Sequence, residues 1–133
     1  MSSSVFEKPF VCNPFSPGLR VRLMGSEPFF GPGVAHLLEL IPAAGSVAGA
    51  CERMGLSYSK GRLMVRRMER ELGFRVVERV QGGAGGGGAR LTEPGLAFLR
   101  AYQSYEQDVN AYAQARFAGA FAGFLPADEE EAP

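Results

Sequence analysis

The segment from Ser46 to Gly73, SVAGACERMGLSYSKGRLMVRRMERELG, constrains the fold of this chain more than any other part of it. Ser46 and Ser57 favour the N-cap of a helix, and Gly55 and Gly73 stand where a helix can end in a left-handed residue. Between these signals, apolar residues recur at the spacing of a buried helical stripe. The sequence therefore predicts two short helices joined by a three-residue turn, which is a helix-turn-helix pattern.

Small residues inside the two predicted helices favour a tight crossing. Gly49 and Gly61 are poor helix formers, and glycine is tolerated in a helix interior mainly where another backbone comes close. Two helices that cross over a short turn need such an approach. A plain helical hairpin within a bundle is the alternative interpretation of the same pattern.

The second helix turns cationic side chains away from its buried stripe. With about 100° per residue, the side chains that lie roughly 100° to 200° from the stripe are Ser59, Arg62, Leu63, Arg66 and Arg70. An α-helix fits the major groove of DNA, where arginine forms two hydrogen bonds with guanine, and Ser or Tyr can reach bases or phosphates. Ser46 and the amides behind it can hold a phosphate. We therefore expect DNA contacts from Ser46, Ser57, Tyr58, Ser59, Lys60, Arg62 and Arg66.

A glycine-rich run lies between two β-like segments that follow Gly73. FRVVERV and ARLT are rich in β-branched residues, and six glycines lie between Gln81 and Ala89. A strand, a tip and a returning strand would form a hairpin, which is the wing of a winged helix-turn-helix. The wing residues expected to contact the DNA backbone or minor groove are Arg79, Gln81, Gly82, Gly83, Gly85, Gly86 and Arg90.

Two other interpretations of the glycine run compete with a wing. A nucleotide site is disfavoured, because the G-x-G-x-x-G at Gly83, Gly85 and Gly88 is not followed directly by the helix that such a site requires. No lysine followed by Ser or Thr closes the run, so a P-loop is disfavoured too. An idle linker stays open as the second interpretation.

Charge is unevenly distributed along a chain of ordinary composition. The 133 residues are 46% apolar and suit about one domain, and 14 basic residues balance 14 acidic ones. Residues 52–90 nevertheless carry nine basic and four acidic side chains, whereas residues 91–133 carry two and seven. A basic middle segment favours one surface that faces a polyanion, with a merely solvated face as the alternative.

Several classes of function find little support. No apolar run is long enough for a membrane helix and no signal-peptide pattern opens the chain, so we expect a cytoplasmic protein. His36 is the single histidine, and Cys12 and Cys51 are far apart, so neither metal-ligand spacing nor a disulfide framework is present. Acid–base and nucleophile–base groups cannot be assembled. We expect no enzyme activity, no cofactor and no identifiable small-molecule effector.

The last long segment predicts a helix that pairs with a second copy of the chain. Thr92 is suited to cap this helix, and Pro94 to its first turn. Apolar residues recur at alternating spacings of four and three, which is a heptad seam. The residues expected at the dimer interface are Phe98, Tyr102, Tyr105, Val109, Tyr112, Phe117 and Phe121. Packing of the same stripe inside one chain is the alternative.

These signals predict a mainly α fold with a small β-hairpin (α+β), a winged helix-turn-helix with a long C-terminal dimerisation helix. Residues 1–18 form an irregular arm, and residues 19–92 the DNA-binding domain. Residues 93–125 form the dimerisation helix, and residues 126–133 a disordered acidic tail. Within the domain, Leu19–Gly25 alternates as a half-buried strand does, and a helix opens near Gly31–Gly33 and closes near Ala44.

The chain resembles a known family over roughly residues 31–105. Gly45 and Ser46, Ser57 and Tyr58, the VVER motif at 76–79, the glycine run and the LT-G pattern at 91–95 are similar to the N-terminal DNA-binding domain of the molybdate-responsive ModE regulators. That domain is related to the LysR-type regulators. The resemblance implies a winged-helix homodimer on DNA, with 57–72 as the reading helix and 82–88 as the wing tip.

The resemblance is to the single-domain members of that family. Two-part members continue into an oxyanion-sensing domain, so molybdate sensing is not implied here. Many relatives have Ala-Trp where this chain has Gly61 and Arg62. The sequence thus predicts a transcription regulator that binds specific double-stranded DNA as a homodimer. A winged-helix protein-interaction module without DNA binding is the alternative function.

Overall fold

The structure is a computed structural model that describes residues 11–81 and 87–126. Contacts divide the chain into two compact units. The larger unit runs from Arg20 to Gln107, and the smaller one joins residues 11–19 to residues 108–126. No helix in the described ranges is long and apolar enough to cross a membrane.

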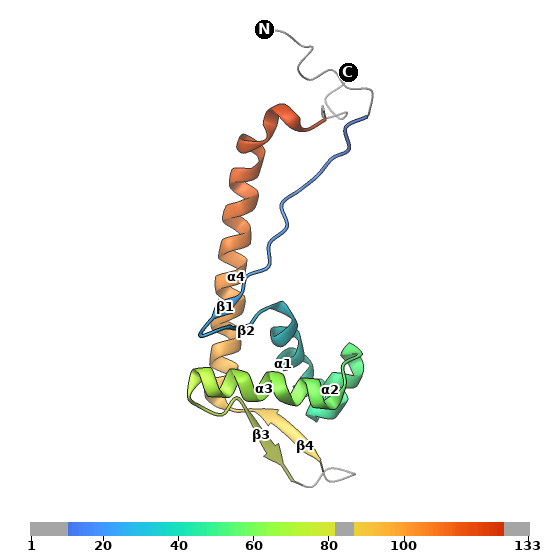
Figure 1. Cartoon of the computed structure of the whole chain (residues 1–133), viewed down its shortest axis with the longest axis vertical. Helices are drawn as coiled ribbons and strands as arrows, with labels where there is room; N and C mark the ends of the chain where they lie inside the picture. Colours follow the sequence, from blue (N-terminus) through green and yellow to red (C-terminus); the bar gives the residue numbers. More distant parts are fainter. Residues whose placement is uncertain (1–10, 82–86, 127–133) are drawn as a thin grey trace. The chain divides into compact units, whose positions relative to one another are not determined.

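The larger unit is a winged helix-turn-helix (Figure 1). Helix α1 packs against α2 and β4, and β2 packs against α3. The predicted mainly helical fold with a β-hairpin after the second helix of the motif is confirmed. In chain order the elements are β1 (Leu23–Met24), β2 (Pro28–Phe30), α1 (Pro32–Ala44), α2 (Val47–Met54), α3 (Tyr58–Leu72), β3 (Val77–Val80), β4 (Gly88–Leu91) and the start of α4 (Glu93–Ala120).

The ends of α2 and α3 lie where the sequence predicted them. The Ser46 hydroxyl accepts a hydrogen bond from the Gly49 amide at 2.9 Å, and the Ser57 hydroxyl accepts one from the Lys60 amide at 3.1 Å. Gly55 and Gly73 end the helices with φ angles of 72° and 81°, in the left-handed region that glycine enters without strain. Local capping chemistry therefore fixes both helices of the motif.

The crossing of α2 and α3 is as tight as Gly61 indicated. A Cβ atom at Gly61 would collide with the Sγ atom of Cys51, so only glycine lets α3 come this close to α2. Burial raises the pKa of the Cys51 thiol, which keeps it protonated and makes it a packing group. Glycine is favoured at position 49 by a different contact. A Cβ atom there would lie 3.0 Å from the Ser46 hydroxyl oxygen and 3.2 Å from the Ala44 Cβ atom at the end of α1.

The core of the larger unit draws on every helix. The predicted inner face of α1 is confirmed, since its side chains at 37, 38 and 41 are completely buried. A deeply buried ring, Phe30, packs edge-on against Phe98 of α4 at 4.9 Å between ring centroids. The buried apolar residues are Phe30, Ala35, Leu37, Leu38, Ile41, Ala50, Cys51, Met68, Val76, Val77, Leu99 and Tyr102.

The wing hairpin, β3 with β4, is tied to the helical body at its base. Its strands pair antiparallel from Val77 opposite Leu91 to Val80 opposite Gly88. The Ala89 amide donates to the Gly45 carbonyl at 2.9 Å, which holds β4 against the end of α1. Residues 82–86, which include the expected DNA contacts Gly82, Gly83, Gly85 and Gly86, lie outside the described residues.

The strand expected over Leu19–Gly25 is wrong in extent, and a second hairpin was missed. Only Leu23–Met24 is a strand, and it pairs with β2 in an irregular antiparallel ladder. Met24 lies opposite Pro28, which has no N–H to donate, so the ladder cannot extend through this position. Alternating apolar residues in the sequence predicted a strand but contained no information about how short its partner is.

The smaller unit is a cluster of aromatic rings around the last turns of α4. The Phe15 ring packs edge-on against Phe117 at 5.6 Å and against Phe121 at 6.1 Å between centroids. The Cys12 thiol donates to the Phe124 carbonyl at 3.2 Å. Helix α4 ends at Ala120 and is followed by a 3-10 turn, Ala122–Phe124, so it is shorter than the segment assigned to it.

Candidate nucleic-acid interface

Helix α3 exposes the face that the sequence assigned to DNA. Its polar and cationic side chains at 59, 60, 62, 66 and 70 are all exposed, and Leu63 among them is 43% exposed. The stripe on the other side, which includes Gly61 and Met68, is buried. The face that α3 presents to solvent is therefore cationic.

A cleft of about 650 Å³ separates α3 from the wing hairpin, and we call it the wing cleft. Tyr58, Arg62 and Arg66 line it from α3, and the start of α2 contributes Val47 and Ala48. The wing and its root contribute Arg75, Arg79 and Gln81. Five of the predicted contact residues thus meet around one cleft: Tyr58, Arg62, Arg66, Arg79 and Gln81.

The wing cleft carries a surplus of positive charge. Four arginines line it, at positions 62, 66, 75 and 79, against two carboxylates, Glu69 and Glu78. Glu69 is turned toward the wing root, where its carboxylate is 3.9 Å from the Arg75 Nε atom. A groove with cationic walls attracts a polyanion such as the DNA backbone.

One arginine of the cleft rests on an aromatic ring. The guanidinium carbon of Arg62 lies 5.6 Å from the centroid of the Tyr58 ring, within the range of a cation–π contact. Such a contact restricts the rotamers of a long side chain, so the Arg62 side chain would lose less conformational entropy on binding a ligand. Tyr58 therefore positions the Arg62 side chain, and its own ring is also exposed to solvent.

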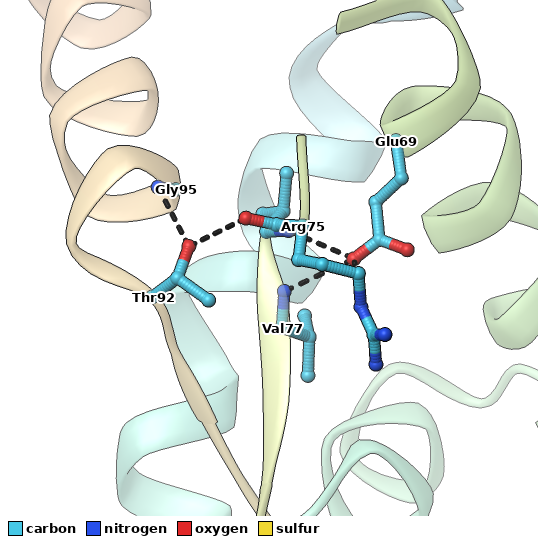
Figure 2. Close-up of polar contacts among 6 residues, drawn as sticks. Glu69, Arg75, Val77, Thr92 and Gly95 are labelled. Carbon is cyan, nitrogen blue, oxygen red and sulfur yellow. Dashed lines mark hydrogen bonds and ion pairs between the residues drawn. The ribbon is translucent and has the colours of Figure 1, made fainter. Parts of the chain in front are cut away.

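Two side chains that the sequence did not single out as a pair hold the root of the wing (Figure 2). The Glu69 carboxylate accepts hydrogen bonds from the Val76 and Val77 amides at 2.8 and 3.2 Å. From the other side, the Thr92 hydroxyl donates to the Arg75 carbonyl at 2.6 Å and accepts from the Gly95 amide at 3.0 Å. Glu69 and Thr92 thereby fix the wing root to α3 and to the start of α4.

Replacing Thr92 with Val is expected to lower the free energy of unfolding by about 1–3 kcal/mol, because the shape is kept while a helix cap and a hydrogen bond to the wing root are lost. Denaturant unfolding of the purified protein measures this change. Thr92→Ser keeps the hydroxyl and should retain most of the stability. Equal losses in both variants would mean that the methyl group of Thr92, and not its hydroxyl, provides the stability.

Three predicted contact residues already have partners within the chain. The hydroxyls of Ser46 and Ser57 cap α2 and α3, where they accept hydrogen bonds from the Gly49 and Lys60 amides. Arg90 lies opposite Glu78 on the neighbouring strand, and its Nε atom is 2.7 Å from the Glu78 carboxylate. Binding of a phosphate by Arg90 would therefore compete with this ion pair, which the sequence did not indicate.

Two residues assigned to the dimer interface make packing contacts within one chain: Tyr102 is part of the core, and the half-buried Phe98 packs against the core. Tyr102 is 3% exposed, and its hydroxyl donates to the Val21 carbonyl at 2.7 Å. Burial, and then the neighbouring Glu106 carboxylate, raise the pKa of this hydroxyl. Phe98 packs against Phe30. A heptad seam and an internal stripe have the same spacing, which explains why the sequence did not separate them.

The described residues contain no group of three His, Cys, Asp or Glu side chains that could hold a metal ion.

Residues 35–96, which include α2, α3 and the wing, match the model of the bacterial regulatory helix-turn-helix proteins of the LysR family. The helix-turn-helix of this chain is similar to that of the LysR family. This match confirms the LysR-like resemblance and supports a DNA-binding transcription regulator.

A bacterial protein is similar to part of this chain. The molybdenum-pterin-binding protein MopA of Rhodobacter capsulatus is 34% identical over 89 residues, which are 67% of this chain and 33% of MopA. The chain therefore spans about a third of the length of this relative.

Two solved structures are similar to the LysR-type domain. The DNA-binding domain of CbnR in complex with DNA aligns with a TM-score of 0.53 and 23% identity, covering 66% of this chain and 95% of that one. ArgP from Mycobacterium tuberculosis aligns with a TM-score of 0.46 and 26% identity, covering 66% and 31%. The likeness to the CbnR domain supports the winged helix-turn-helix fold.

Proposed function

We propose that this protein binds specific double-stranded DNA sequences as a homodimer, with α3 in the major groove and the wing on the backbone or minor groove. The observation that carries the proposal is the wing cleft, where Arg62 and Arg66 of α3 face Arg79 of the wing. Arginine is the side chain that most often reads guanine in the major groove, and a helix of this kind fits that groove.

The contacts divide into two kinds in this proposal. Arg62 and Arg66, exposed on α3, read base edges. Lys60, Arg79 and Arg90 bind phosphates, which fix the position of the domain on the duplex without reading sequence. Tyr58 supports Arg62, and the amides at the start of α2, behind the Ser46 cap, bind a further phosphate.

Selection of bound duplexes from a random pool tests the function directly. We expect a palindromic consensus, because a two-fold symmetric dimer binds two equivalent half-sites. The relative MopA is named a molybdenum-pterin-binding protein, so the selection is carried out with and without molybdate. Flat fluorescence anisotropy with labelled duplexes at low salt would contradict DNA binding and leave the protein-interaction module as the function.

Replacing Lys60 or Arg79 with Ala is expected to weaken binding to specific and random duplexes alike. Each change removes about one phosphate contact, so the slope of log K against log salt should flatten by about 0.9. Fluorescence anisotropy titrations over a series of salt concentrations measure the slope. Arg116→Ala, an exposed charge on α4, is the control that should leave it unchanged. A loss confined to the preferred sequence would reassign these residues to base reading.

The homodimer rests on the exposed part of the predicted seam. Tyr105 and Tyr112 of α4 are 54% and 68% exposed, and Val109 lies between them in the sequence at the same heptad spacing. Large aromatic side chains that a single chain leaves in water are suited to an interface between copies. Phe117 and Phe121 already contact Phe15 within the chain, so they would take a smaller part.

Replacing Tyr112 with Glu is expected to shift the protein from dimer to monomer, because a charge would be buried in an apolar interface. Sedimentation equilibrium at micromolar concentration should give twice the 14.2 kDa of one chain for the wild type and 14.2 kDa for the variant. Gln114→Glu, on the same helix and exposed, should remain a dimer. A monomeric wild type would refute the homodimer.

A further inference from the structure

A second cationic surface lies on the larger unit, away from the wing cleft. It is a cavity of about 250 Å³ between the β1–β2 hairpin, the start of α1 and α3. Arg20, Arg22 and Arg67 line it, and no acidic side chain is among the described residues that line it. We call these three residues the arginine cluster. The first turn of α1 also borders the cavity with Gly33 and Val34, and the Gly31 N-cap provides no side chain to cap this helix end.

The arginine cluster lies on the flank of α3 that faces away from the wing. Arg67 follows Arg66 by one residue, so it points about 100° further around the helix, while Lys60 is seven residues earlier and has nearly the same direction as Arg67. Arg66 lines the wing cleft and Arg67 lines the second cavity, with no residue common to the two linings. Helix α3 is therefore bordered by positive charge on both sides.

The charges of the arginine cluster are not compensated within the described chain. The ion pairs found there are His36–Glu39, Arg75–Glu69 and Arg90–Glu78, and none of them includes a member of the cluster. Glu71 lies one turn beyond Arg67 on α3, and its carboxylate accepts a hydrogen bond from the Ser26 hydroxyl at 3.3 Å. Three like charges gathered at one cavity repel one another unless an anion lies between them.

We propose that the arginine cluster binds the phosphates of the DNA strand that forms the wall of the major groove opposite the wing. The inference rests on the proposed function and extends it. A helix in the major groove has a row of phosphates on each side, because the groove is bounded by two strands. The wing cleft binds one row of phosphates, and the arginine cluster binds the other. The two rows together hold α3 in the groove from both sides, which sets how deeply Arg62 and Arg66 reach.

Ethylation interference tests the proposal at the level of single phosphates. The probe is the duplex selected from the random pool, with ethylated phosphates, and the protein is the full chain. For the wild type we expect interference on both walls of each half-site. For the double variant Arg22→Gln, Arg67→Gln we expect interference to disappear on one wall and to persist on the other. The salt slope of binding should flatten by about two contacts, or roughly 1.8, in the same variant.

Matched controls separate this proposal from the proposed function. Arg100→Gln removes one exposed charge from α4, outside both cavities, and should keep interference on both walls. If the double variant is unfolded by circular dichroism, the single variant Arg20→Gln takes its place, because Arg20 is exposed at the end of the unit. If the double variant binds DNA like Arg100→Gln, phosphate binding by the arginine cluster is refuted and the proposed function stands. A wild type without affinity for any duplex overturns the proposed function itself.

Discussion

Replacing Arg62 or Arg66 with Ala is expected to weaken binding to the preferred duplex by about 1–3 kcal/mol each, which is up to about a hundredfold in Kd, and to change binding to random duplexes much less. Both arginines line the wing cleft from α3, and Arg62 rests on the Tyr58 ring. An arginine that makes two hydrogen bonds with guanine loses them on any other base, so its removal abolishes discrimination at that base pair.

Anisotropy titrations of each variant on the selected duplex and on a scrambled one measure this difference. Arg70→Ala is the matched control, since it removes the same charge from the same exposed face of α3 but lies outside the wing cleft. The control should weaken both duplexes by a similar, small factor through the loss of one charge. If Arg62→Ala lowers affinity equally for the two duplexes, Arg62 is a phosphate contact and the reading face of α3 must be sought elsewhere on the helix.

The two helices of the motif could be predicted because their signals are local. Ser46, Ser57, Gly55 and Gly73 act within one turn of their own positions, and the structure uses each of them as predicted. The cationic face of α3 follows from helical geometry once the buried stripe is known. The close approach at Gly61 could be inferred too, because few other conditions favour glycine in a helix interior.

Contacts between distant segments could not be predicted in the same way. The ion pair between Glu78 and Arg90 depends on the register of the wing strands, and the glycine run conceals that register. The hydrogen bonds of Glu69 with the wing root join residues on two elements, and nothing in the sequence around Glu69 marks it as different from the other charges of α3. Arg22 and Arg67 likewise come together only in the folded unit.

The stripe of α4 shows a different limit. Phe98 and Tyr102 pack inside the larger unit, whereas Tyr105 and Tyr112 are exposed. All four fit one spacing, because a helix that packs on its own domain and a helix that packs on a second copy both bury a face of nearly the same period. Periodicity therefore predicts that α4 buries a stripe, and only the tertiary structure shows which part of the stripe is already covered.

Replacing Gly95 with Ala is expected to lower the free energy of unfolding by about 2 kcal/mol or more, although alanine favours an isolated helix over glycine by about 1 kcal/mol. A Cβ atom at Gly95 would lie 2.5 Å from the Val76 carbonyl oxygen and 2.9 Å from the Val76 Cα atom. Both are backbone atoms of the wing root, so no side-chain rotation relieves the contact. Glu69 holds this backbone through the Val76 amide, and Thr92 donates its own amide to the Val76 carbonyl at 2.9 Å.

Thermal unfolding measures the effect, and a loss of this size corresponds to a fall in Tm of about 10 °C for a domain of this length. Gly119→Ala is the matched control on the same helix, since no atom lies within 4 Å of a Cβ built there, and it should leave Tm unchanged or raise it slightly. A displaced α4 would also move the wing root, so Gly95→Ala should weaken DNA binding even below the melting transition. If Gly95→Ala is as stable as Gly119→Ala, the backbone of the wing root can move to accept the Cβ atom. Glu69 and Thr92 would then not hold the wing root rigidly against α4.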